Sequence, residues 1–141
     1  MIGFFEHQYL SFKKRHIRNL VALANSDGHM HDDEKLLIFK LGEKYGLKER
    51  QVRMILDSNK ENKLYVPEKD EDKMDQLYDL LQMVYADGVV DDNEVEFCKE
   101  VVSKFGFKDT LVDKLLDLFA KGDPAPVDWD DVKIDLIKRY S

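Results

Sequence analysis

The chain has 141 residues, 43% hydrophobic and 36% charged, a composition that predicts one folded domain with a buried core and excludes a disordered tail. Residues 1–60 carry a net charge of +3 and residues 61–141 a net charge of −10. The acidic second half argues against general nucleic-acid binding, because neutralising phosphates needs clustered cations. No apolar run is long enough to cross a membrane and the first residues lack the order of a signal peptide, so we expect a cytoplasmic protein.

The first predicted elements are two helices. Aromatic residues on one side predict a helix over about 5–14. Ile17, Leu20, Val21 and Ala24 predict a second helix that runs up to the Asp27-Gly28 turn. The aromatic side of the first helix fits three roles: a core face, a homodimer contact, or an edge that touches a membrane. Its members are Phe4, Phe5, Tyr9 and Phe12.

An internal repeat organises the rest of the chain. Residues 20–48 align without a gap to residues 80–108, at an offset of 60. Two copies are too few for an open solenoid, so we expect a closed pair of helical repeats. Eight aligned pairs are identical: Leu20/Leu80, Asp27/Asp87, Gly28/Gly88, Asp32/Asp92, Glu34/Glu94, Lys44/Lys104, Gly46/Gly106 and Lys48/Lys108.

Each copy is predicted to contain three helices. After the Asp-Gly turn, an apolar stripe predicts a helix that ends at Gly46 or Gly106, where glycine supplies a left-handed backbone. Third helices are expected over 49–57 and 109–120, and a last helix over 129–140, anchored by Trp129. The fold class is therefore all-α: a compact bundle of about seven to eight helices built from two pseudo-twofold-related repeats. We expect a single domain over 1–141, with repeat 1 at about 15–58, a linker at 59–70 and repeat 2 at about 71–121.

The repeated turns, SDGHMHDDE (26–34) and ADGVVDDNE (86–94), carry the most unusual pattern. They do not fit a calcium EF-hand, because Leu23 and Met83 stand where the first carboxylate ligand belongs. Asp91 and Glu94 fit a capping box at the start of the next helix. In the first copy His31 takes the cap position, where it is a poor choice, so Asp32 is the alternative cap.

Asp27 and Asp87 are not explained by capping. Each lies at the predicted end of a helix, where an anionic side chain opposes the helix dipole at a cost of roughly 0.3–1 kcal/mol. That both copies keep this placement indicates a counter-charge, a metal ion or a specific hydrogen bond.

The doubled pattern, in which an apolar helix is followed by A/S-D-G-x-x-x-x-x-E and an amphipathic helix ending in glycine, resembles the TerB-like domain of tellurite-resistance proteins over about residues 15–140. The resemblance implies a non-enzymatic cytoplasmic stress-response module of about seven helices. It also implies divalent metal binding through the acidic turn residues. Carried over by position, these are Asp27, Glu34, Asp87 and Glu94.

Three hypotheses for function follow. The first is a module that binds a divalent metal ion of unspecified identity, with His31 and Asp91 as weaker ligands, and presents a surface to a protein partner or to a second copy. The second is a metal-free adaptor that uses an acidic helical face, formed by residues 70–79 with Glu96, Glu100, Asp113 and Asp117. The third, an enzyme, is disfavoured because the one cysteine, Cys98, falls on a packing stripe and no nucleophile–base pair is evident.

Overall fold

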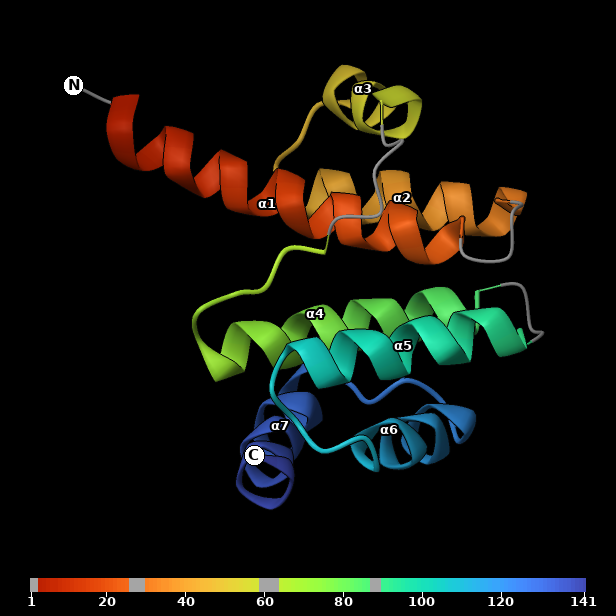
Figure 1. Cartoon of the computed structure of the whole chain (residues 1–141). Coiled ribbons are helices and arrows are strands. Elements are labelled where there is room, and N and C mark those ends of the chain that lie inside the picture. Colours follow the sequence, from red (N-terminus) through yellow and green to blue (C-terminus); the bar gives the residue numbers. More distant parts are fainter. Residues whose placement is uncertain (1–2, 26–29, 59–63, 87–89) are drawn as a thin grey trace. The chain divides into compact units, whose positions relative to one another are not determined.

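The computed structural model describes residues 3–25, 30–58, 64–86 and 90–141, and the side chains of 3–12 and 126 are outside that description. Seven helices and no strand occur in these residues, which confirms the all-α prediction. The chain forms two compact units, Met1–Tyr65 and Val66–Ser141, described in turn below (Figure 1). The expected twofold relation between the repeats concerns the placement of these units and stays a prediction.

The first unit contains α1 (Gly3–Ala24), α2 (Asp32–Lys44) and α3 (Glu49–Ser58). The prediction of a separate helix over about 5–14 is wrong, because α1 is continuous for 22 residues. Residues 11–18, SFKKRHIR, contain no glycine or proline, so no residue breaks the helix between the two predicted segments. The apolar stripe of this helix is buried as expected. Its buried members are Ile17, Leu20, Val21, Leu23 and Ala24.

The α2 and α3 helices approach each other closely at Gly42. A β-carbon at this position would lie 2.6 Å from Cγ2 of Val52, a distance that real side chains do not adopt. Glycine therefore lets α3 pack directly on the backbone of α2. Val52 and Ile55 of α3 and Leu47 of the connecting turn are buried there.

The second unit contains α4 (Asp70–Val84), α5 (Asp92–Lys104), α6 (Leu111–Ala120) and α7 (Pro126–Tyr140). The last helix begins earlier than the expected residue 129, because Pro126 occupies its first turn, where proline is tolerated. The α7 helix packs on α4 through Trp129, which is 4% exposed. The indole Nε1 of Trp129 donates to Oδ1 of Asp75 at 3.1 Å, and its ring centroid lies 5.0 Å from that of Tyr78.

Both predicted helix-ending glycines are confirmed. Gly46 has φ of 81° and Gly106 has φ of 87°. The amide of Gly46 donates to the carbonyl of Glu43 at 2.9 Å and that of Leu47 to the carbonyl of Gly42 at 2.8 Å, the two bonds of a Schellman motif. The second unit makes the same pair of bonds, from Gly106 to Ser103 and from Phe107 to Val102. The repeat seen in the sequence thus ends its middle helix in the same way in both units.

Candidate functional site

Glu34 is a buried carboxylate at the start of α2. It is the third residue of the helix, and only 1% of its surface is exposed. Its Oε1 accepts a hydrogen bond from the amide of His31 at 3.0 Å. Its Oε2 is also buried, and no residue in the described part of the chain donates a hydrogen bond to it. A carboxylate removed from water in this way favours a nearby positive charge.

Glu94 occupies the same position in α5. It is the third residue of that helix and is 2% exposed. The helix N-terminus carries a partial positive charge, which stabilises an anionic side chain in the first turn. Both copies of the repeat therefore place a buried glutamate at the beginning of the helix that follows the Asp-Gly turn.

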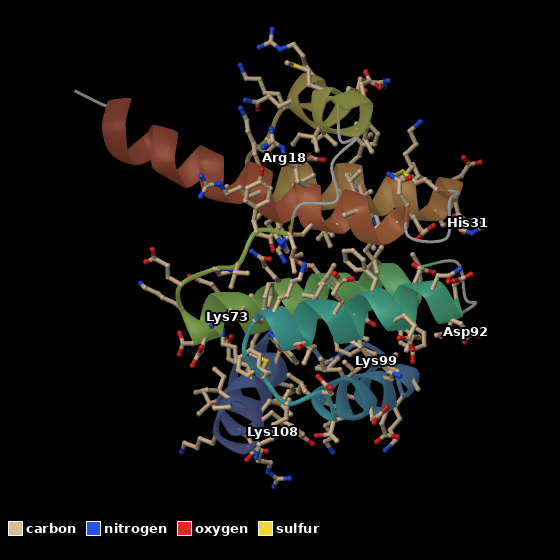
Figure 2. All side chains as sticks on the ribbon, viewed as in Figure 1. Arg18, His31, Lys73, Asp92, Lys99 and Lys108 are labelled. Atoms are coloured by element: carbon tan, nitrogen blue, oxygen red, sulfur yellow. The ribbon has the colours of Figure 1, made fainter. Side chains whose placement is uncertain are left out.

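The two weaker candidate ligands, His31 and Asp91, are the N-cap residues of α2 and α5. Asp91 Oδ1 accepts a hydrogen bond from the amide of Asn93 at 2.8 Å, as expected of a capping aspartate. The alternative in which Asp32 caps the first copy is wrong, because His31 is the cap and Asp32 is the first helical residue. Figure 2 labels His31 and Asp92 at the beginnings of α2 and α5.

The other two predicted ligands, Asp27 and Asp87, lie outside the described residues. The described residues alone bring together no group of three or more histidine, cysteine, aspartate or glutamate side chains able to hold a metal ion. What they do provide is a buried glutamate at the same place in each repeat, Glu34 and Glu94, with His31 or Asp91 three residues before it.

Cys98 is buried on α5, as its place on the apolar stripe predicted. Burial, and the charge of Glu94 one turn earlier, raise the pKa of its thiol to about 12. The thiol is therefore protonated at neutral pH, and a protonated buried thiol is a poor nucleophile.

The predicted acidic face is not one exposed surface, because Asp79 within residues 70–79 is buried, with 1% of its surface exposed. Glu96, Glu100, Asp113 and Asp117 are exposed, and three of these four form ion pairs. In three ion pairs a lysine Nζ lies close to a carboxylate oxygen of the same helix or its end. The distances are 3.3 Å for Lys99–Glu96, 3.3 Å for Lys104–Glu100 and 3.6 Å for Lys121–Asp117. All are pairs three or four residues apart on exposed helix surface. Such pairs contribute little to stability.

Two features of the first unit were not predicted from the sequence. One is a clamp in which the side chain of Asn19 bonds both backbone groups of Tyr65, donating to its carbonyl at 2.9 Å and accepting from its amide at 3.1 Å. Arg15 also lies over the ring of Tyr65, 5.4 Å from its centroid. The signal in the sequence was an asparagine among the apolar residues of α1.

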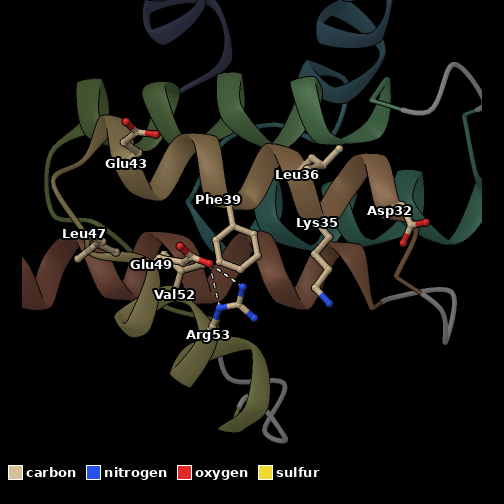
Figure 3. A pocket seen from close by; sticks show the side chains of 9 residues that line it. All are labelled: Asp32, Lys35, Leu36, Phe39, Glu43, Leu47, Glu49, Val52 and Arg53. Atoms are coloured by element: carbon tan, nitrogen blue, oxygen red, sulfur yellow. Dashed lines mark hydrogen bonds and ion pairs between the residues drawn. The ribbon is translucent and has the colours of Figure 1, made fainter.

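The second unpredicted feature is a groove of about 720 Å³ between α2 and α3, which we call the α2 groove (Figure 3). Its signal in the sequence was a pair of apolar residues, Leu36 and Phe39, on the polar side of α2. The lining residues are Asp32, Lys35, Leu36, Phe39 and Glu43 of α2, Leu47 of the turn, and Glu49, Val52 and Arg53 of α3.

Comparison with protein-family models, with curated proteins and with solved structures gives no match for this chain. None of the described helices combines the length and the apolar character needed to cross a membrane.

Proposed function

We propose that this chain is a non-enzymatic, TerB-like binding module that holds a divalent cation at each of its repeated turns. In this proposal Asp27 and Glu34 are ligands in the first copy, and Asp87 and Glu94 are ligands in the second. The observation that carries the proposal is the buried carboxylate of Glu34, whose Oε2 receives no hydrogen bond from any described residue.

The physical argument is one of charge compensation. An ionised carboxylate in a buried position is costly unless hydrogen bonds or an opposite charge compensate it. One amide, that of His31, bonds one of the two carboxylate oxygens of Glu34. A divalent cation bound by the other oxygen would supply the missing charge, and a second carboxylate from the Asp-Gly turn would complete its neutralisation.

The proposed ligand atoms indicate a class of metal ion, but they do not identify one ion. Carboxylate oxygens alone suit calcium, magnesium or manganese, whereas the addition of the His31 imidazole suits zinc or manganese. Because Asp91 stands where the first copy has His31, the two turns are expected to differ in their preference. With the imidazole nitrogen of His31, the first turn is expected to prefer zinc or manganese.

The test is thermal unfolding of chelator-stripped protein with and without calcium, magnesium, manganese or zinc. A ligand that binds only the folded state adds about 2.7 kcal/mol of stability at one hundred times its dissociation constant. We expect a saturable rise in Tm with at least one ion, and loss of that rise in a Glu34→Gln/Glu94→Gln variant.

The matched control is Asp33→Asn. Asp33 is an exposed carboxylate in the same helical turn as Glu34, so its replacement changes the local charge without removing a proposed ligand. Its metal response should equal that of the unaltered protein. No shift with any of the four ions, or a shift that survives the loss of both glutamates, would contradict the proposal.

A metal-free adaptor is the second candidate, favoured by one observation. Residues 66–141 contain 20 acidic and 10 basic residues, and exposed Asp113 forms no ion pair with any described residue. A basic partner held by this surface would dissociate as salt is raised, because exposed charges are screened. Binding that does not respond to salt would argue against this candidate.

A further inference from the structure

The α2 groove runs along nearly the whole length of its helix. Its residues on α2 extend from Asp32 to Glu43, which is about 16 Å at the rise of an α-helix. Leu36 and Phe39 lie in the middle of this stripe, and Val52 of α3 contributes to the lining from the other side. A groove of this length can receive one side of an amphipathic helix.

The centre of the groove combines apolar surface with the ammonium of Lys35, and carboxylates, those of Asp32 and Glu43, stand at the two ends of its α2 side. Leu36 is 65% exposed and lines the groove. Arg53 lies over the ring of Phe39, and its Nε donates to Glu49 at 3.1 Å, so its charge is already matched (Figure 3). Lys35 has no ion-pair partner in the described part of the chain.

The second repeat shows that the fold itself does not require this surface. At the offset of 60, Glu96 stands in place of Leu36 and Lys99 in place of Phe39. These two residues form an ion pair with each other at 3.3 Å. The same helix position is thus polar and self-compensated in α5 but apolar in α2, so the second repeat does not keep the apolar pair at this position.

The chain itself carries a helix with the complementary surface. On α7, Val127 is 78% exposed and Ile134 is 47% exposed, and the two lie seven residues apart on one side of the helix. Asp131 lies between them on the same side, is exposed, and has no ion-pair partner among the described residues. The opposite side of α7 is the one that buries Trp129 and Leu136.

We propose that the α2 groove of one copy of this chain receives the exposed side of α7 from a second copy. Val127 and Ile134 then cover Leu36 and Phe39, and the carboxylate of Asp131 meets the ammonium of Lys35. The net charges agree with this pairing, since residues 1–65 carry +3 and residues 66–141 carry −10. Contact between two copies of the first unit would instead bring like charges together.

This contact joins two different surfaces, so it is heterologous: each copy offers one groove and one α7. The inference does not depend on metal binding at the repeated turns. It concerns a separate question, namely which surface of the chain is covered by a second copy.

The test is sedimentation equilibrium of the full chain over a range of concentrations. We expect the average mass to rise above that of one chain as concentration increases, and to fall at high salt. Leu36→Glu, which installs the residue of the second repeat, and Ile134→Lys, which places a second cation opposite Lys35, should each reduce self-association at least tenfold. A chain that stays monomeric at every concentration would overturn the proposal.

Mixing the two variants separates this contact from any other. The Leu36→Glu chain retains its α7 surface and the Ile134→Lys chain retains its groove, so an equimolar mixture should form a 1:1 complex although neither associates alone. The controls are Met54→Glu and Val66→Lys, which remove apolar residues of matching exposure, 64% and 48%, outside both surfaces. A mixture that remains monomeric, or controls as damaging as the variants, would overturn the proposed pairing of surfaces.

Discussion

A single buried amide, that of Asn19, fixes where the chain leaves the first unit. Asn19 is fully buried in α1, and its side chain bonds both the amide and the carbonyl of Tyr65, 46 residues later. Backbone groups in a partly buried position need such partners, because unpaired ones are costly. Asn19 therefore does for Tyr65 what a neighbouring strand would do in a sheet.

We predict that Asn19→Ala lowers the free energy of unfolding by about 2–4 kcal/mol, because it removes two hydrogen bonds and leaves both backbone groups of Tyr65 without them. Urea unfolding followed by circular dichroism measures this loss. Asn93→Ala is the control, since Asn93 is exposed. A loss for Asn19→Ala no greater than that of the control would show that water replaces the amide without cost.

At the same scale, the sequence predicted some site residues well and others poorly. Glu94 and Asp91 were identified as a capping pair because their spacing is typical of one, and Asp91 does cap α5. The burial of Glu34 and Glu94 was not predicted, because spacing along a chain does not reveal what covers a side chain. In the first copy the spacing placed His31 at the cap, and Asp32 stayed open as an alternative because statistical preference ranks aspartate above histidine; the structure has His31 as the cap.

At the scale of elements, the close approach of α2 and α3 depends on Gly42. Glycine within a helix normally costs about 1 kcal/mol relative to alanine, so replacement by alanine would ordinarily stabilise the helix. Here the added methyl group would lie 2.6 Å from Cγ2 of Val52. The packing conflict and the helix preference therefore act in opposite directions at one residue.

We predict that the packing conflict dominates and that Gly42→Ala destabilises the protein by about 1–3 kcal/mol. Chemical denaturation measures the change. A Gly42→Ala/Val52→Ala double variant tests the cause, because it removes the methyl group that the new side chain meets. If the double variant shows no positive coupling between the two substitutions, the clash is not the reason for the loss.

Most of the elements were predictable from periodicity, and the exceptions have physical reasons. The stripes and the helix-ending glycines gave the positions of α2, α3, α5 and α6, because these signals are local. The division of α1 into two helices was wrong because the aromatic side near residue 9 and the aliphatic side near residue 20 were read as separate stripes. The α2 groove was invisible to periodicity, because it is formed by the polar side of one helix and a neighbour.

At the scale of the whole molecule, the second unit carries several groups that make it sensitive to alkali. Folding raises the pKa of Tyr78, Tyr85, Cys98 and Lys133, all in residues 66–141. Burial raises the pKa of both tyrosines, with nearby aspartates adding to it. Burial alone would lower the pKa of Lys133, but its bonds to Asp75 and Asp130 outweigh burial and raise it.

We predict that the second unit loses stability from about pH 9 upward. A group whose pKa is raised by folding contributes stability below its unfolded pKa and loses it as pH rises toward the folded value. For Cys98 that window runs from its usual 9.0 to about 12, and the loss by pH 10 is about 1 kcal/mol. Denaturation at pH 8 and at about pH 10 measures it.

Cys98→Ala provides the control for alkaline sensitivity. It removes the titrating thiol, so the variant should be less stable at pH 8, where it lacks the packed sulfur, and should lose less stability on going to alkaline pH. Equal losses in the variant and the unaltered protein would assign the alkaline transition to the tyrosines and Lys133 instead.

The position of Trp129 also determines what optical spectroscopy can observe in this molecule. It is the one tryptophan of the sequence, and it lies in the core of the second unit between Asp75 and Tyr78. Its emission is an intrinsic reporter of that core, whereas far-ultraviolet circular dichroism sums the helices of both units. The pair of signals resolves the two halves of the chain without any added dye: a transition seen by dichroism but absent from the emission belongs to the first unit.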